Sequence, residues 1–309
     1  MNTERNTDMN SSTASPLLDF GFYSQKAQKD GVAATGAAIE FILNQLPERN
    51  RWCVEFGAWD GLVGSTSRPL ILEREYSAVL IEGNPERFAD LKKNYAGNDR
   101  VITRNQFVGF TAADGLDSIL AGTPAPRDFD FLTVDIDGND YQVWKAVEKY
   151  RPKVVMIEFN PTIPPEVSFI QPADPMVNEG NSLTALVELG KKKNYELVAV
   201  LGVNAFFVTA ELFPRFNIAD NRVETLWTNR DCVTYFFTGY DGKVFLRGCR
   251  KLPWQEGLPF NEMQVQVLPG FLQRYPWTPK HRRWHLALKR PGTFLKKVLR
   301  RLVGVKNQA

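Results

Sequence analysis

Apolar residues recur in two alternating patterns along the first two thirds of the chain. Short apolar runs that predict buried strands stand at residues 52–56, 77–82, 101–108, 129–135 and 153–159. Segments with apolar residues at helical spacing lie before and between them, at residues 34–46, 62–74, 85–95, 114–121 and 140–150. Pro69 would bend the second helix or confine it to its later part. Strands that alternate with helices predict right-handed βαβ units and a parallel sheet covered on both faces.

The end of this region predicts a different strand pairing. A Pro-rich loop at residues 160–181 and a helix near 182–193 precede two apolar runs, at 195–201 and 205–210. Only three residues separate these runs, which permits an antiparallel hairpin but no parallel crossover. The predicted fold is therefore α/β, with a sheet that is mostly parallel and has a terminal antiparallel strand. This pattern resembles the Rossmann-like sheet of class I methyltransferases.

The C-terminal third differs in character. Residues 216–279 are rich in aromatic side chains and include the run TYFFTGYDGKVFLRG, which predicts a hairpin that turns at Asp241-Gly242. We therefore expect four regions. They are a flexible leader at 1–30, a methyltransferase domain at 31–215, a small β-rich C-terminal extension at 216–279, and a basic amphipathic tail at 280–309.

Charge is divided unevenly along the chain. The formal net charge is +3, but no Asp or Glu follows Glu262, and 11 of the 38 basic residues lie beyond it. An acidic body with a basic tail suggests that the tail has a partner of its own. Both histidines, His281 and His285, also lie in the tail. A hydrolase that uses a Ser-His-Asp or Cys-His site is therefore excluded unless the tail folds back.

The three cysteines, Cys53, Cys232 and Cys249, form no CxxC motif and predict neither a disulfide framework nor a zinc site. No apolar stretch reaches the length of a membrane span, and the N-terminus lacks the pattern of a secretory signal. We expect a cytoplasmic protein.

The first predicted strand leads into a glycine-containing turn, Glu55-Phe56-Gly57-Ala58-Trp59-Asp60-Gly61. Ligands of open α/β sheets bind beyond the carboxyl ends of the strands, where glycine lets the backbone approach them. The spacing E-x-G-x-x-x-G differs from the G-x-G-x-x-G of dinucleotide binders. An acid at the start of the turn suits a cationic ligand such as S-adenosylmethionine (AdoMet). An ordinary strand-to-helix turn is the alternative interpretation.

Glu82 ends the second predicted strand, where an acidic side chain can accept hydrogen bonds from both ribose hydroxyls of a nucleotide. A helix-capping or solvated acid is the alternative. The residues that we expect to bind AdoMet are Glu55, Gly57, Ala58, Gly61, Glu82 and Asn84.

A second polar group follows the fourth and fifth strands, as Asp135-Ile136-Asp137-Gly138-Asn139-Asp140 and Glu158-Phe159-Asn160. We expect Asp135 and Asp137 to be catalytic. Four oxygen-bearing side chains would converge at this edge of the sheet and hold a hard cation such as Mg²⁺, or act as a base and its orienter: Asp135, Asp137, Glu158 and Asn160. Helix capping by Asp137 or Asn139 is the alternative.

On these residues the chain resembles the FkbM-type methyltransferases over about residues 20–210. The resemblance is carried by Tyr23-Ser24-Gln25, Val54 to Ala58 with Gly61, Ile81 to Pro85, Val134 to Gly138, and Ile157-Glu158. It implies AdoMet-dependent O-methylation of a hydroxyl on a sugar, glycan or related natural product. Asp137 and Asp140 depart from the family's usual acids by one methylene each, and Trp59 changes its usual first turn. A weaker similarity, on Asp137-Gly138-x-Asp140-Tyr141, is to the Mg²⁺-using macrocin-type sugar O-methyltransferases.

Two other functions stay open. The first is a non-catalytic nucleotide- or glycan-binding module with a methyltransferase fold in a polysaccharide assembly system; the acids at both strand ends disfavour it. The second is a nicotinamide oxidoreductase, which the missing G-x-G-x-x-G and the terminal hairpin disfavour.

The segment at 292–305 places apolar residues on one helical face and Lys296, Lys297, Arg300 and Arg301 on the other. Such a helix fits a membrane interface with anionic headgroups, at the inner face of the membrane, or docks on the protein. Nucleic acid is disfavoured as a partner, because the acidic body would repel it.

Overall fold

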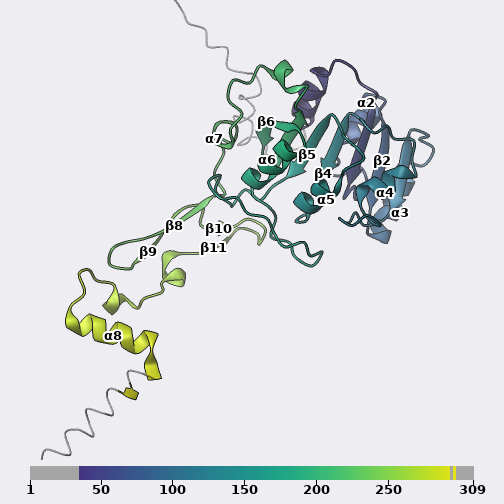
Figure 1. Cartoon of the computed structure of the whole chain (residues 1–309). Helices are drawn as coiled ribbons and strands as arrows, with labels where there is room; N and C mark the ends of the chain where they lie inside the picture. Colours follow the sequence, from purple (N-terminus) through teal and green to yellow (C-terminus); the bar gives the residue numbers. More distant parts are fainter. Residues whose placement is uncertain (1–34, 293–294, 297–309) are drawn as a thin grey trace, which may run out of the picture. The chain divides into compact units, whose positions relative to one another are not determined.

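The computed structural model describes residues 35–292 and 295–296 (Figure 1). Its contacts divide the chain into two compact units, Met1–Arg230 and Asp231–Ala309. The predicted leader at 1–30 and most of the amphipathic segment at 292–305 lie outside the described residues.

Strands and helices alternate through the first unit. Residues 35–44 are helical. The strands are β1 (Trp52–Phe56), β2 (Ser77–Glu82), β3 (Val101–Asn105), β4 (Phe131–Val134), β5 (Val154–Glu158), β6 (Tyr195–Leu201) and β7 (Asn204–Thr209). The helices are α2 (Arg68–Glu73), α3 (Pro85–Asn94), α4 (Leu116–Ala121), α5 (Asp140–Ala146), α6 (Leu183–Lys192), the 3-10 helix η1 (Phe213–Phe216) and α7 (Val223–Leu226).

The seven strands form one sheet in the order β3-β2-β1-β4-β5-β7-β6. Strands β1 to β5 pair in parallel, and β7 pairs antiparallel with both β5 and β6. This arrangement confirms the predicted class I methyltransferase sheet. Because β1, β2, β4 and β5 run in one direction, their carboxyl ends meet at one edge, where the predicted site residues lie.

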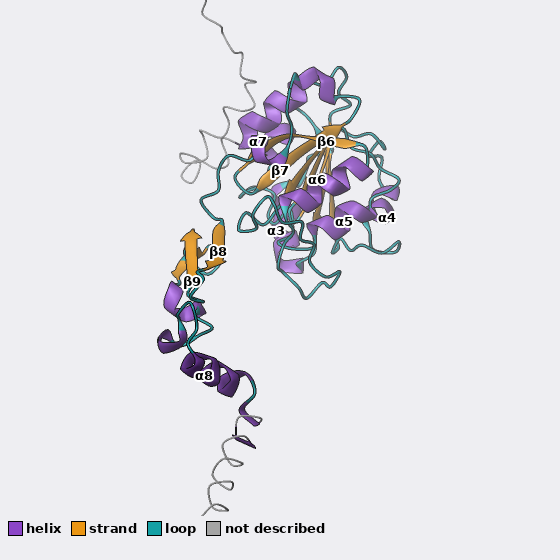
Figure 2. Ribbon diagram, turned by 60° about the vertical axis from the view of Figure 1, so that its left-hand side comes forward, coloured by secondary structure: helices purple, strands orange, loops and turns teal. Residues whose placement is uncertain are grey.

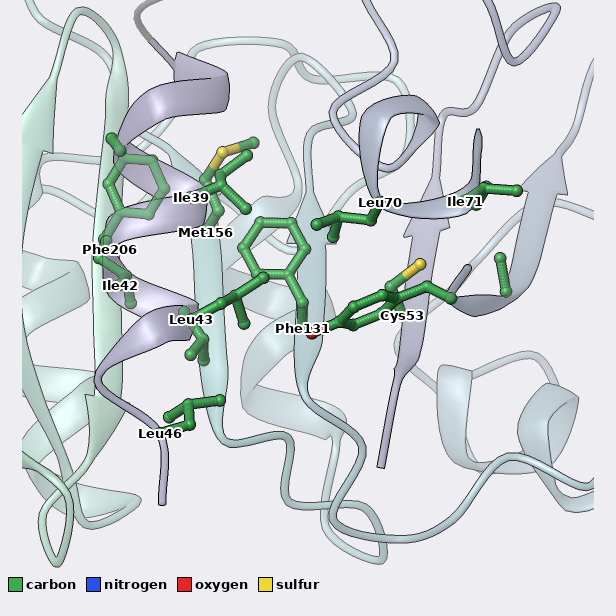
Figure 3. Packing of buried hydrophobic residues seen from close by; sticks show 14 of the residues in the cluster. Ile39, Ile42, Leu43, Leu46, Cys53, Leu70, Ile71, Phe131, Met156 and Phe206 are labelled. Carbon is green, nitrogen blue, oxygen red and sulfur yellow. The ribbon is translucent and has the colours of Figure 1, made fainter. Parts of the chain in front are cut away.

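Helices cover both faces of the sheet, as the apolar strands predict. Phe206 of β7 packs with Ile39, Ile42 and Met156 under the helix at 35–44 (Figure 3). The next residue, Phe207, points to the opposite face, where its ring centroid lies 5.0 Å from that of Trp144 in α5. This alternation along one strand lets the sheet bury side chains on both faces. Figure 2 shows α5 and α6 side by side over the second face.

Several predicted elements are shorter in the structure, and the reason is clear for two of them. Helix α2 begins only at Arg68, next to Pro69, so the proline confines the predicted helix to its later part. The prediction that β3 continues to residue 108 is wrong, because β3 ends at Asn105. The Asn105 amide donates hydrogen bonds to the carbonyls of Glu82 and Gly83, and the chain leaves the sheet there.

The second unit contains small ribbons and short helices. Its elements are β8 (Thr234–Thr238), β9 (Val244–Gly248), β10 (Lys251–Leu252), β11 (Leu258–Pro259), the 3-10 helices η2 (Glu262–Val265) and η3 (Gly270–Leu272), and α8 (Pro279–Lys289). Strands β8 and β9 form the predicted hairpin, with Gly242 at φ +79° in its turn. None of the helices that the structure describes is long and apolar enough to cross a membrane.

The boundary at residue 215 stays a prediction. Residues 216–230 pack with the first unit, and the ring of Trp227 lies 5.2 Å, edge to face, from that of Phe159 after β5.

Candidate active site

The turn after β1 lies directly against the end of β4. Gly57 has a φ of +72°, and a Cβ at this position would collide with the carbonyl oxygen of Asp135. Glycine meets both demands, since it has no side chain and adopts positive φ without strain. The predicted cofactor turn and the predicted catalytic acid are therefore neighbours in the structure.

Glu55 is buried, and its carboxylate organises the segment that leads into α2. It accepts hydrogen bonds from the Ser65 hydroxyl at 2.6 Å, from the amide and hydroxyl of Thr66 at 3.0 and 3.1 Å, and from the Ser67 amide at 3.3 Å. Four bonds fill the acceptor capacity of a carboxylate. Glu55 therefore positions the loop at 65–67, while its predicted direct contact with the cofactor stays a prediction.

Glu82 stands at the end of β2 and joins the two neighbouring turns. One carboxylate oxygen accepts the backbone N–H of Trp59 at 2.8 Å, and the other accepts that of Asn84 at 2.7 Å. Each oxygen keeps one further lone pair, so the side chain is still able to accept one hydrogen bond through each. Two vicinal ribose hydroxyls would supply those two bonds.

The remaining predicted cofactor residues shape the backbone. Asn84 caps α3, because its side-chain oxygen accepts the amides of Glu86 and Arg87. Gly61 has a φ of +72°, and its carbonyl accepts the Tyr95 hydroxyl at 2.8 Å. Ala58 is buried. Contacts of these three residues with a cofactor stay predictions.

Two exposed aromatic rings flank this part of the site. Phe107 is 77% exposed although it touches Gly83, where a Cβ would collide with its ring. Trp59 is 51% exposed, and the Arg87 guanidinium lies 3.6 Å from its ring centroid. Sequence reasoning placed Phe107 inside a strand and missed it. One feature of the sequence could have identified Phe107. It is an isolated aromatic residue just after β3, and β3 pairs with β2, the strand that ends in Glu82.

Three carboxylates meet beyond β4 and β5, as predicted for this edge of the sheet. Asp135, Asp137 and Glu158 each offer an oxygen atom, and these atoms lie within 4.8 Å of one another. Asp137 has a φ of +56°, in a tight turn that Asp140 closes. Asp140 is buried and accepts the backbone N–H groups of Ile136 and Gly138 at 3.0 and 2.9 Å.

The close approach of these acids changes their protonation. Burial, and then the charges of Asp137 and Glu55, raise the pKa of Asp135. Burial, and then the charge of Asp135, raise the pKa of Glu158, and the two carboxyl groups are in hydrogen-bonding contact. Burial also raises the pKa of Asp140 to about 7, although the hydrogen bonds from the backbone of Gly138 and Ile136 lower it. A proton shared between Asp135 and Glu158, or a bound cation, would relieve the repulsion between these buried carboxylates.

Asn160 is engaged in the loop that follows β5. Its side-chain oxygen accepts the amide and hydroxyl of Thr162 at 2.9 and 2.6 Å, and its amide donates to the Glu179 carbonyl. Both lone pairs of the oxygen are therefore in use. The predicted role of Asn160 as a cation ligand stays a prediction that requires these bonds to open.

A pocket of about 130 Å³ opens beside the acid cluster. Asp135, Thr66 and Asn204 are among the residues that line it. The side-chain oxygen of Asn204 is buried without a hydrogen-bond partner among the described residues. Asn204 is opposite Glu158 in the β5–β7 ladder, which explains its position. Sequence reasoning treated it as part of a turn. The sequence feature that could have identified Asn204 is its position as a polar residue at the start of β7, the strand that pairs with Glu158 of β5.

A larger groove adjoins this pocket. Its volume is about 640 Å³, and it runs between the helix at 35–44 and α2, over Ile39, Leu43 and Leu70. The two hollows share Gly36, Thr66 and Pro69 as lining residues, so they are continuous at that point.

Comparison with known proteins finds partial structural likeness. No protein-family model and no curated protein matches the sequence. The structural neighbours are AdoMet-dependent methyltransferases. The CMeT domain of the citrinin polyketide synthase is 9% identical, with a TM-score of 0.40 over 62% of this chain and 55% of that chain. A putative sarcosine dimethylglycine methyltransferase from Galdieria sulphuraria is 14% identical, with a TM-score of 0.35 over 55% of this chain and 62% of that chain. The N-terminal domain of EvdMO1, with SAH bound, is 11% identical, with a TM-score of 0.38 over 56% and 78%. The chain thus spans less than two thirds of the length of the citrinin synthase domain and of the Galdieria methyltransferase.

Proposed function

We propose that the protein is an AdoMet-dependent O-methyltransferase that acts on a hydroxyl of a sugar, glycan or related natural product. The observation that carries this proposal is the contact between Gly57 and Asp135. It joins a turn built for a nucleoside cofactor to a cluster of carboxylates at the edge of a class I methyltransferase sheet. The resemblance to FkbM-type methyltransferases in the same motifs supports the hydroxyl as acceptor.

The cofactor is proposed to lie across the ends of β1 and β2. Glu82 accepts the two ribose hydroxyls with the lone pairs that Trp59 and Asn84 leave free. The exposed ring of Phe107, held against Gly83, offers its face to the adenine. The backbone of the turn from Gly57 to Gly61 approaches the methionine part, and Glu55 fixes the following loop at residues 65–67.

The chemistry is a displacement at the methyl carbon of the bound AdoMet. The acceptor oxygen forms a bond to this carbon while the carbon–sulfur bond breaks, and the products are a methyl ether and S-adenosylhomocysteine. Asp135 takes the hydroxyl proton, with Asp137 beside it. Glu158 keeps its own proton and donates it to Asp135 as a hydrogen bond, which fixes the orientation of the base. Asn204, with its unpartnered oxygen, helps to position the acceptor in the pocket.

A divalent cation is the second way to balance the cluster. Three carboxylate oxygens within 4.8 Å of one another suit a hard cation such as Mg²⁺. Asp135, Asp137 and Glu158 would hold it, and it would lower the pKa of an acceptor hydroxyl. Adding a chelator distinguishes a bound cation from a proton shared by Asp135 and Glu158. Lost activity that Mg²⁺ restores supports the cation, and indifference to chelator supports the shared proton.

Two measurements test the proposed function. In calorimetry, AdoMet should bind to the purified chain and NAD should not. With labelled AdoMet, methyl transfer to cell-envelope glycan fractions should then be detectable. AdoMet binding without transfer to any fraction would favour a non-catalytic module, and the absence of AdoMet binding would overturn the cofactor assignment itself.

A further inference from the structure

The second unit exposes an unusual share of large apolar side chains. Of the 22 large hydrophobic residues that are exposed in the described parts of the chain, 15 lie in this unit, from Tyr235 onward. The unit comprises only about a quarter of the chain. Tyr240, Met263 and Val267 are 93%, 82% and 80% exposed. An accumulation of exposed apolar side chains of this kind indicates an interaction site.

One face of the β8–β9 hairpin combines aromatic rings with cations. The register places Phe237 opposite Phe245, and their rings stack with centroids 5.2 Å apart. The guanidinium of Arg247 lies 5.7 and 5.6 Å from these two rings, and the Lys243 ammonium lies 5.1 Å from Phe245. The hairpin thus presents positive charge beside apolar rings, an arrangement that fits the boundary between lipid headgroups and acyl chains.

A groove of about 780 Å³ lies within the same unit. Lys243 and Arg250 line it together with Met263, Val267 and Leu268. No ion pair involves Lys243 or Arg250 among the residues that the structure describes. The acid in the lining, Glu262, is already paired with Arg247 at 2.8 Å. The groove therefore offers two available cations next to apolar walls.

Net charge separates the two units. The second unit carries 15 Lys and Arg against 4 Asp and Glu, a formal charge of +11. Without the tail, residues 231–291 carry 10 Lys and Arg against the same 4 acids, a formal charge of +6. The first unit has 23 basic and 31 acidic residues, a formal charge of −8. A partner of the second unit is consequently anionic, and the charge of the first unit works against a long polyanion that would extend along the whole protein.

We propose that the second unit docks on a membrane surface that contains anionic phospholipids. Phe237, Tyr240 and the neighbouring exposed rings enter the interface, and Lys243 and Arg250 contact lipid phosphates at the groove. Exposed apolar residues such as Leu258, Met263 and Leu286 gain cover from acyl chains, which a nucleic acid would not provide. This surface is distinct from the tail at 292–305, and the inference does not depend on methyl transfer.

The test is flotation of the full chain with vesicles of phosphatidylcholine alone or mixed with phosphatidylglycerol. The wild type should float with the mixed vesicles, and more salt should release it. The double variant Lys243→Gln/Arg250→Gln should bind about 25-fold more weakly, at about fivefold per cation. The double variant Phe237→Ser/Tyr240→Ser should bind about tenfold more weakly for each ring removed.

Matched controls lie in the first unit. Lys92→Gln/Lys93→Gln removes two exposed cations of α3, and Leu72→Ser/Met176→Ser removes two side chains that are 53% and 89% exposed. Both controls should float like the wild type, and thermal melting checks that every variant is folded. Wild-type affinity of the second-unit variants would overturn the proposal. So would equal binding to phosphatidylcholine alone, or binding to single-stranded RNA in place of vesicles.

Discussion

At the scale of single residues, cofactor binding in the proposed site depends most directly on Glu82. Glu82→Ala removes two charge-assisted hydrogen bonds to the ribose, each worth about 1.5–3 kcal/mol. AdoMet affinity measured by calorimetry should therefore fall at least about a hundredfold. Asn105→Ala is the matched control, because it loosens the same turn by removing bonds to the carbonyls of Glu82 and Gly83. If Glu82→Ala binds AdoMet within twofold of the wild type, the assignment is wrong.

The acid cluster gives a second prediction at this scale. Asp135→Asn and Asp137→Asn should keep AdoMet affinity and lose turnover at least a hundredfold, the usual contribution of general-base catalysis. Glu158→Gln should retain most activity at neutral pH, because a glutamine amide replaces the proton that a neutral Glu158 donates to Asp135. Equal loss of activity in Glu158→Gln and Asp135→Asn would contradict the shared proton and favour a bound cation.

The pH profile of the wild type provides an independent measurement. A base must be ionised to accept a proton, so activity is lost as pH falls through the pKa of the pair. Burial and mutual repulsion raise the pKa of both Asp135 and Glu158. The acidic limb of the kcat profile should therefore lie above the pH range of an ordinary carboxylate. A limb at the ordinary carboxylate pKa would place the base elsewhere.

The sequence predicted where the polar side chains of the candidate site lie, but not which hydrogen bonds they form. The strand ends predicted the convergence of Asp135, Asp137 and Glu158, because parallel strands bring their carboxyl ends to one edge. The four bonds of Glu55 could not be predicted, since its partners Ser65 to Ser67 lie in a segment that reads as helix. Asn204 was missed for a related reason, as its role depends on the register between β5 and β7.

At the scale of elements, periodicity predicted the order and type of nearly every strand and helix in the sheet. The three-residue connection after β6 was enough to predict that β7 runs antiparallel. Element ends were less predictable, because tertiary hydrogen bonds decide them. The end of β3 depends on the Asn105 amide, and the start of α2 depends on the loop that Glu55 holds.

The long loop at 160–181 yields a prediction of its own. Gln171 is 1% exposed, accepts the amides of Glu179 and Gly180, and donates to the Val177 carbonyl. Asn181 anchors the loop to the Gly138 carbonyl, next to Asp137. This hydrogen-bonded loop therefore supports the turn that carries Asp137, one of the two proposed catalytic acids.

Gln171→Ala removes the side-chain partner of these partly buried backbone groups, at a cost of up to about 1–3 kcal/mol for each group that water does not reach. Hydrogen exchange across residues 171–181 should accelerate, and turnover should fall while AdoMet affinity stays unchanged. Gln142→Ala, which removes only one bond to the Gln171 carbonyl, should have a smaller effect. Unaltered exchange in Gln171→Ala would show that the loop is held by other contacts.

At the scale of the whole molecule, the division of charge is the property that the sequence shows most plainly and the fold explains least. A sheet with helices on both faces accounts for the first unit and its site. It gives no reason for a second unit with a formal charge of +11 and exposed aromatic rings. The proposed function would give such a reason if the acceptor were carried on a lipid or an envelope glycan. The protein would then work next to a membrane.

The tail at 292–305 leads to the last prediction, which rests on its sequence pattern alone. Replacement of Lys296, Lys297, Arg300 and Arg301 with Gln removes about 1 kcal/mol of attraction to an anionic surface for each charge. Affinity for vesicles with phosphatidylglycerol should then fall about a thousandfold at low salt. Four exposed lysines of the first unit, Lys92, Lys93, Lys191 and Lys192, provide the matched control and should be replaceable without effect. A tail variant that floats like the wild type would mean that the predicted tail helix does not contact the membrane. Membrane contact would then belong to the hairpin and groove of the second unit alone.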